Sequence, residues 1–117
     1  MTTENMSRAA IPLPDGLSPF LQLLAEPNRL RILALLADGE RCVCDIEAAL
    51  DLPQNLTSHH LAALRRGGLL ADRRDGRWVY YRLVPDIVQA RVGELTTLLD
   101  TERANTAAAP CGLDKRA

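Results

Sequence analysis

The sequence has little of what marks a secreted or membrane-spanning protein. No run among its 117 residues is long and apolar enough to cross a bilayer, and the first ten residues contain one arginine and no apolar run. Only three cysteines are present, an odd number, and structural disulfides are rare in a reducing cytoplasm. We therefore expect a cytoplasmic protein with no membrane span, no signal peptide and no structural disulfide.

The sequence also lacks the residue patterns of an enzyme. It contains no glycine-rich phosphate-binding loop, and Ser58 lies near His59 and His60 only along the chain. Neighbouring side chains on a helix point about 100° apart, so the two histidines do not form a metal site. We expect that the protein is not an enzyme, that His60 packs as a structural histidine and that His59 faces outward.

The chain is long enough for one hydrophobic core, and we predict one folded domain over residues 17–102. Residues 1–16 and 103–117 are polar or alanine-rich, and we expect a disordered arm and a flexible tail. The net charge is −1, but it is unevenly distributed. Residues 54–82 contain six arginines and two aspartates, a local charge of +4, while the other 88 residues sum to −5. Such a basic segment is typical of contact with nucleic-acid phosphates.

Two short helices with a tight turn between them are predicted within and beside this basic segment. The first helix begins near Cys44 and continues to Leu50, and the second runs from Gln54, just after Pro53, to Arg66. We expect Gly67 to end the second helix in a left-handed conformation. This order of elements is a helix-turn-helix. On a helical wheel one face of the second helix packs inward, namely Thr57, Leu61 and Leu64. The opposite face is small and polar, which suits a DNA major groove.

A basic β-hairpin is predicted next, with strands at 69–74 and 77–83. Asp75-Gly76 between them is typical of a two-residue turn. The second strand alternates, so that Val79, Tyr81 and Leu83 share one face. Three of the four aromatic residues lie in this hairpin, where packing is their usual role, and arginines crowd its tip. A helix-turn-helix followed by such a hairpin is a winged helix, mainly α with a two-stranded wing.

Apolar stripes flank this unit on both sides and predict a dimer interface. An early helix and a long helix from Pro85 to about Thr101 each carry apolar residues at helical spacing. A small winged helix cannot cover both stripes itself, whereas a two-fold dimer can. The predicted interface residues are Leu17, Phe20, Leu21, Leu24, Val88, Val92, Leu95 and Leu99.

Cys42 and Cys44 stand at the start of the first of the two short helices. Two thiols one residue apart can chelate a soft ion, and a helix N-terminus lowers thiol pKa values. If both residues were helical, their side chains would point about 200° apart. Binding one ion through both sulfurs would then unwind the first turn, and the helix leads directly to the helix-turn-helix.

Several motifs together resemble the ArsR/SmtB family over about residues 17–101. The motifs are Arg29-Leu30-Arg31-Ile32-Leu33, Cys42-Val43-Cys44-Asp45, Ser58-His59-His60-Leu61, Leu64-Arg65-Arg66-Gly67-Gly68-Leu69 and Asp75-Gly76-Arg77-Trp78-Val79-Tyr80-Tyr81-Arg82-Leu83. The resemblance implies a dimeric winged-helix repressor that binds double-stranded operator DNA and releases it on binding metal or metalloid. The candidate DNA contacts are Gln54, Asn55, Thr57, Ser58, His59, Arg66, Arg74 and Arg77.

The paired cysteines resemble those of the family's arsenic, antimony, cadmium and lead sensors. Arsenic sensors of the best-known type carry a third cysteine three residues after the second, where this chain has Glu47. The third ligand is therefore open. Cys111, on a tail long enough to reach the pair, is either that ligand or an incidental thiol, and Glu47 suits a divalent cation better than arsenic(III). The last long helix contains no histidine, so the zinc type of site is absent.

We interpret the chain as a repressor that responds to As(III) or Sb(III) through Cys42, Cys44 and Cys111. Three alternatives remain open from the sequence. One is a repressor of the same fold that responds to Cd(II) or Pb(II), a second is a thiol-redox repressor, and a third is a metal-sequestering protein without a DNA function.

Overall fold

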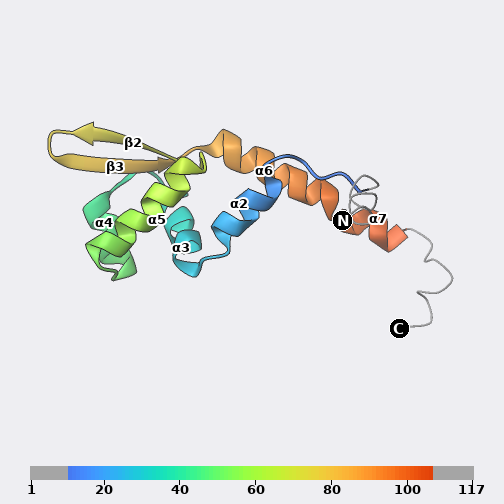
Figure 1. Ribbon diagram of the computed structural model, residues 1–117, viewed down its shortest axis with the longest axis horizontal. Coiled ribbons are helices and arrows are strands. Elements are labelled where there is room, and N and C mark those ends of the chain that lie inside the picture. Colours follow the sequence, from blue (N-terminus) through green and yellow to red (C-terminus); the bar gives the residue numbers. More distant parts are fainter. Residues whose placement is uncertain (1–10, 107–117) are drawn as a thin grey trace, which may run out of the picture.

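The computed structural model describes residues 11–106, which form six helices and three strands over that range. The helices are α2 (Leu17–Leu24), α3 (Pro27–Leu36), α4 (Val43–Leu50), α5 (Gln54–Arg66), α6 (Pro85–Leu98) and α7 (Thr101–Thr106). The strands are β1 (Arg41–Cys42), β2 (Leu70–Asp75) and β3 (Trp78–Leu83). Helices α3, α4 and α5 pack together beneath the sheet, and α6 leads away from the end of β3 (Figure 1). Among the described residues, no helix has the length and apolarity to cross a membrane.

The core lies where α2, α3, α4, α5 and the base of the hairpin meet. Its fully buried side chains include Ile32 from α3, Ile46 from α4 and Leu64 from α5. Burying such a side chain contributes roughly 1.5–3 kcal/mol. Because α4 and α5 share this core, the turn between them is held at a fixed angle, with Asp51 in the left-handed conformation at φ 54°. The predicted helix-turn-helix is therefore confirmed.

The sheet has three strands rather than two. Strand β3 pairs with β2 on one side and with the short β1 on the other, both antiparallel, in the order β1-β3-β2. A strand of two residues is too short to show an alternation of apolar and polar side chains, so β1 could not be predicted from the sequence. The predicted two-stranded wing, formed by β2 and β3, is confirmed, and β1 adds a third strand to its sheet. The added strand matters because Cys42 lies opposite Tyr80 within the sheet.

The turn of the hairpin is displaced by one residue from its predicted place. Asp75 pairs with Trp78, which leaves Gly76 and Arg77 as the two loop residues. Gly76 has φ 63°, and Arg77 is not among the residues with positive φ. A glycine at the first loop position is the requirement of a type II′ turn, which explains the shift. The alternation in β3 is confirmed, since Tyr81 and Leu83 pack against the core while Trp78 is exposed.

The end of α5 also differs in detail from the prediction. Gly67 has φ −77°, and the left-handed residue is Gly68, at φ 84°. Gly67 serves a different purpose. A Cβ added there would meet Leu23 of α2 at 3.0 Å, so its lack of a side chain allows α2 to approach closely.

The flanking segments depart from the predicted domain limits. Residues 11–16, assigned to a disordered arm, contact α6, where Arg91 Nη1 donates to the carbonyl of Asp15 at 2.8 Å. The long C-terminal helix ends at Leu98, and after a break α7 continues through Thr106, inside the predicted flexible tail. Residues 1–10 and 107–117, including Cys111, lie outside the described residues.

Candidate nucleic-acid interface and thiol pair

One face of helix α5 is polar and exposed to solvent. Five of the residues predicted to contact DNA are exposed on it, namely Gln54, Asn55, Ser58, His59 and Arg66. The opposite face is held in the core by Leu61 and Leu64. A rigid helix with a small polar face is suited to reading base edges.

Thr57 does not belong to this face. Its side chain is fully buried, and its hydroxyl donates to the carbonyl of Pro53 at 3.2 Å. A buried side chain whose hydroxyl is already bonded cannot reach DNA without rearrangement of the turn. The assignment of Thr57 as a DNA contact is therefore wrong, while its inward position on the helical wheel is confirmed.

The arginines of the hairpin divide into two groups. Arg73 is bound to Glu40, with its Nη2 2.7 Å and its Nε 2.9 Å from the carboxylate oxygens, and its guanidinium lies 4.4 Å from the ring centre of Tyr80. The hydrogen bond from Arg73 lowers the pKa of Glu40 below its usual value, so the pair stays charged near neutrality. Arg74 and Arg77 instead line a groove that faces α5. Arg74 and Arg77 are thus placed where they could meet a phosphate beside the helix.

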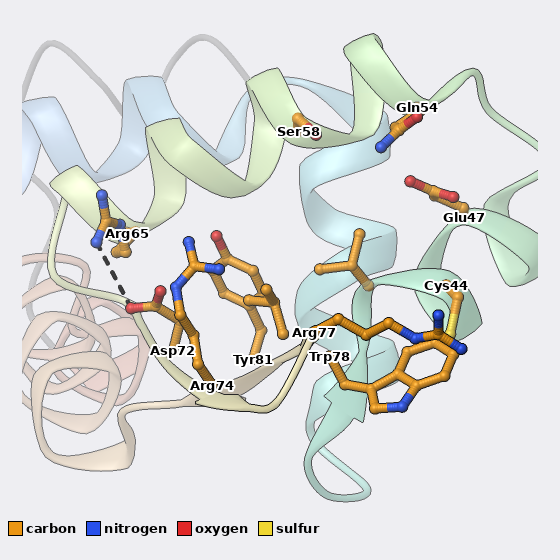
Figure 2. A pocket seen from close by; sticks show the side chains of 12 residues that line it. Cys44, Glu47, Gln54, Ser58, Arg65, Asp72, Arg74, Arg77, Trp78 and Tyr81 are labelled. Carbon is orange, nitrogen blue, oxygen red and sulfur yellow. Dashed lines mark ion pairs between the residues drawn. The ribbon is translucent and has the colours of Figure 1, made fainter.

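This groove, of about 440 Å³, separates the hairpin from the two helices of the helix-turn-helix (Figure 2). Helix α4 and helix α5 form one wall, and the two strands form the other. The lining side chains are Val43, Cys44, Glu47, Gln54, Ser58, Arg65, Asp72, Arg74, Arg77, Trp78, Val79 and Tyr81. The groove is therefore lined by the helix predicted to contact DNA, by Arg74 and Arg77 of the hairpin and by one of the two paired cysteines.

The thiol pair has a geometry that differs from the predicted one. Helix α4 begins at Val43, and Cys42 is its N-cap in an extended conformation, with φ −76° and ψ 158°. Because Cys42 lies outside the helix, its side chain turns back toward that of Cys44, and the Cα atoms are 5.4 Å apart. The conflict expected for two helical residues does not arise. Both sulfurs converge without unwinding α4, so unwinding is not required for joint ligation.

The two sulfurs are joined as a disulfide in this structure, although no structural disulfide was expected; a redox-active pair at these cysteines was one of the open alternatives. The residues differ in accessibility, since Cys42 is buried and Cys44 is exposed. The Sγ atom of Cys42 also accepts a hydrogen bond from the backbone N–H of Asp45 at 3.3 Å.

A third donor lies beside the pair. The sulfurs of Cys42 and Cys44 and a carboxylate oxygen of Asp45 are all within 4.8 Å of one another. Asp45 directly follows Cys44 in the sequence, yet only Glu47 and Cys111 were predicted as candidates for this position. Glu47 instead lines the groove. Two sulfurs and one oxygen suit a divalent cation of intermediate softness.

His60 links α5 to the helix before the thiol pair. The side chain is buried, Arg29 Nε donates to its Nδ1 at 3.2 Å, and its Nε2 lies 3.9 Å from a Glu26 carboxylate oxygen. Glu26 also caps α3 by accepting from the backbone N–H of Asn28 at 2.6 Å. Burial is the largest cause that lowers the pKa of His60, with Arg29 adding to it and Glu26 opposing it. The predicted structural role of this histidine is confirmed.

The candidate dimer face is smaller than predicted. Leu17 and Phe20 are buried in the core of their own chain, so they are not free to form an interface, and that part of the prediction is wrong. Leu24, Val88 and Leu95 are partly buried and pack against the same core. Leu21, Val92 and Leu99 remain exposed, with 48% and 61% of the last two side chains accessible, and no residue of α6 is buried. An apolar stripe on α6 therefore remains uncovered.

Comparison with known proteins places this architecture in a family. The family described as "Bacterial regulatory protein, arsR family" matches residues 26–72, from the start of α3 to the second strand. The solution structure of the homodimeric winged helix-turn-helix DNA-binding domain Mb0332 from Mycobacterium bovis, described as a possible ArsR-family regulator, is 31% identical. It superposes with a TM-score of 0.61 over 81% of this chain and 89% of that one. This chain belongs to the ArsR family.

Curated relatives of this ArsR-family chain include regulators named for arsenic and cadmium resistance. The arsenical resistance operon repressor of Escherichia coli is 54% identical over 67 residues, 56% of this chain and 57% of that protein. The cadmium resistance regulatory protein CadC of Listeria innocua is 42% identical over 67 residues, 56% of each chain. The match thus spans a little over half the length of the curated relatives. The fold and family are established by these matches.

Proposed function

We propose that this chain is a homodimeric transcriptional repressor that binds operator DNA and releases it when As(III) or Sb(III) binds Cys42 and Cys44. One observation carries the proposal: the thiol pair stands at the N-terminus of α4, and Cys44 opens into the groove that α5 shares with Arg74 and Arg77. A ligand at the pair therefore acts directly on the surface proposed to hold DNA. The arsenical resistance repressor of Escherichia coli supports the choice of ligand.

Each structural part has a separate task in this proposal. The exposed face of α5, with Asn55, Ser58 and His59, reads base edges, while Arg74 and Arg77 contact phosphates. The uncovered stripe of α6 joins two copies, so that two α5 helices reach two half-sites of a palindromic operator. Thiolates rather than carboxylates bind a soft centre such as arsenic. Cys111, outside the described residues, remains the proposed third sulfur ligand.

The test is release of fluorescein-labelled DNA from the promoter region upstream of the protein's own gene. Reduced protein is titrated in parallel with arsenite, antimonite, cadmium, lead and zinc, and fluorescence anisotropy reports the bound DNA. We expect arsenite and antimonite to release DNA at the lowest concentrations. Cys42→Ser and Cys44→Ser should each bind DNA as the unmodified protein does and no longer release it. If the reduced, metal-free variants lost DNA binding, the cysteines would be structural instead.

A second candidate, release by Cd(II) or Pb(II), is favoured by the carboxylate of Asp45 beside the two sulfurs. The same titration separates the two ligand classes, and Asp45→Asn serves as the diagnostic variant. This change should weaken the cadmium response and leave the arsenite response intact, because arsenic(III) prefers sulfur. Metal binding with no DNA binding at all would identify a sequestering protein.

A thiol-redox repressor is favoured by a different observation, the disulfide between Cys42 and Cys44. Here oxidation itself would release DNA. Anisotropy is compared for protein equilibrated in oxidised and in reduced glutathione, with Cys44→Ser as the control. A metalloid sensor shows equal or nearly equal DNA affinity in the metal-free oxidised and reduced forms, whereas a redox repressor loses affinity on oxidation.

A further inference from the structure

The outer end of the hairpin has little support from the rest of the sheet. Strand β1 pairs with β3 only at Tyr81 and Tyr80, so from Arg74 to Val79 the ribbon is two strands wide. Figure 1 shows this end of the hairpin reaching past α4. A two-stranded ribbon is at best marginally stable by itself in water. Its position is therefore sensitive to contacts that its side chains make with other elements.

Two ion pairs, made by neighbouring residues of β2, connect the hairpin to the rest of the domain. Side chains of successive strand residues point to opposite faces of a sheet. On the face toward α5, Asp72 Oδ1 lies 3.5 Å from Arg65 Nη1 (Figure 2). On the other face, Arg73 reaches across β3 to Glu40, which directly precedes β1. Both ion pairs thus lie immediately before the two-stranded end of the hairpin.

The geometry of the Arg73–Glu40 pair is the more restrictive of the two. Arg73 donates three hydrogen bonds of 2.7, 2.9 and 3.0 Å to the two carboxylate oxygens of Glu40, and its guanidinium lies 4.4 Å from the ring centre of Tyr80. The Arg65–Asp72 pair has one contact at 3.5 Å, although the two arginines are similarly accessible. A bidentate arginine–carboxylate pair fixes direction as well as distance. The Arg73–Glu40 pair is therefore the stronger constraint on the hairpin.

The pair lies outside the groove beside α5, whereas the next residue of the strand, Arg74, lines that groove. Because the side chains alternate, holding Arg73 on the outer face directs Arg74 toward α5. An exposed ion pair adds little to the stability of a fold. A hairpin that is already ordered, however, does not have to be ordered when DNA binds, and this saving strengthens binding.

We propose that Glu40 and Arg73 are positioning residues for operator binding, which hold the hairpin where Arg74 and Arg77 meet the DNA backbone while α5 lies in the major groove. This inference rests on the proposed function. It adds to that function two residues that act on DNA binding without touching DNA.

The negative charge of Glu40 allows the proposal to be tested by the sign of one effect. If Glu40 acted only through its charge, Glu40→Gln would strengthen DNA binding, because a carboxylate repels phosphates and Arg73 would be released to contact them. If Glu40 holds the hairpin, the same change weakens binding. We expect the Kd for the labelled promoter DNA to rise at least about 4-fold, since ordering one side chain at an interface costs roughly 2- to 12-fold in affinity and both protomers are affected.

Two further variants serve as controls in the same anisotropy assay. Asp38→Asn removes an equal charge at an exposed position two residues earlier, and it should leave the Kd unchanged or lower it. The reciprocal exchange, Glu40→Arg with Arg73→Glu, keeps the net charge and restores an ion pair, so it should recover most of the lost affinity. The salt dependence of Glu40→Gln should match that of the unmodified protein, because Arg74 and Arg77 still reach phosphates.

Trp78 provides a readout without DNA, because it is the only tryptophan in the chain and lies in the outer end of the hairpin. Time-resolved fluorescence anisotropy should show more fast local motion of its indole in Glu40→Gln than in the unmodified protein or in Asp38→Asn. The urea midpoint of unfolding should stay nearly unchanged. A lowered midpoint that accounts for the lost affinity would identify a structural role and overturn the inference.

DNA binding by Glu40→Gln that is as tight as that of the unmodified protein, or tighter, would also overturn the inference and leave the proposed function intact. An exchanged pair that recovered no affinity would do the same. If the unmodified, reduced protein did not bind the promoter DNA, the proposed function itself would fail. The two failures are therefore distinguishable.

Discussion

Replacing different arginines of the hairpin should have different effects on DNA binding, because the structure gives them different partners. Arg74 and Arg77 line the groove beside α5, whereas Arg73 is held by Glu40 and lies over Tyr80. The double substitution Arg74→Ala and Arg77→Ala should weaken binding to all DNA sequences and lower its salt dependence. Arg73→Ala, with the same change in charge per site, should leave the salt dependence nearly unchanged.

The size of the effect follows from the number of phosphates released. Each phosphate contact contributes about 0.9 to the slope of log K against log salt concentration. Two arginines in each of two protomers make at most four contacts, so the double variant should lose up to about 3.6 units of slope. Between 50 and 200 mM salt, the unmodified protein should then lose up to about 150-fold more affinity than the double variant.

Fluorescence anisotropy at five salt concentrations measures this slope for specific and nonspecific DNA. Asn55→Ala and Ser58→Ala provide the contrast, since we expect them to change the preference among operator variants and leave the slope unchanged. If Arg73→Ala reduced the slope per site as much as the double variant did, Arg73 would also contact phosphate. The division of the hairpin arginines would then be wrong.

Three further outcomes are expected. Val92→Glu places a charge on the exposed stripe of α6 and should raise the dimer dissociation constant by at least about 100-fold in sedimentation analysis. Burying one valine side chain contributes roughly 1.5–3 kcal/mol, and a symmetric dimer loses this contribution in both protomers. Ala90→Glu, pointing about 160° away, should have little effect. Burial lowers the pKa of His60 from its ordinary 6.5, so its stabilisation is complete above about pH 6.5 and decreases as the pH falls toward the lowered pKa. Urea unfolding of His60→Gln should lack that decrease. Cys111→Ser should reduce the sensitivity of DNA release to arsenite but leave the response to methylarsenite intact. X-ray absorption should then show two sulfur neighbours per arsenic; an unchanged spectrum would show that Cys111 is not a ligand.

Most of the fold could be predicted because its elements are marked by local patterns. The limits of α5 were predicted to the residue from the preceding proline and the glycines that follow. The strand that contains Tyr81 was predicted from its alternation. The two-residue strand β1 could not be predicted, because it exists only through pairing with β3 and has no period of its own. The hairpin turn was misplaced by one residue because Asp75-Gly76 and Gly76-Arg77 both satisfy a two-residue turn rule.

The errors within the site have a different origin, namely tertiary packing. Leu17 and Phe20 have the same helical spacing whether they cover their own core or a partner's surface, and the stripe alone does not distinguish the two. Thr57 was known to share a face with Leu61, but only the burial of that face excludes it from DNA. The partners of Arg73 and His60 lie more than 30 residues away in the sequence, where no spacing rule applies.

The position of Cys42 connects these observations. This one residue is the N-cap of α4, a member of the sheet opposite Tyr80, and a buried neighbour of the core. Tyr80 in turn lies opposite Arg73, which is bound to Glu40, two residues before Cys42. Under the proposed function, a ligand on the Cys42 sulfur would act on both walls of the groove, on α4 through the cap and on the hairpin through β1. Because α4 shares its core with α5, we expect a shift of either wall to change the width of the groove, the dimension that DNA bound there would have to match.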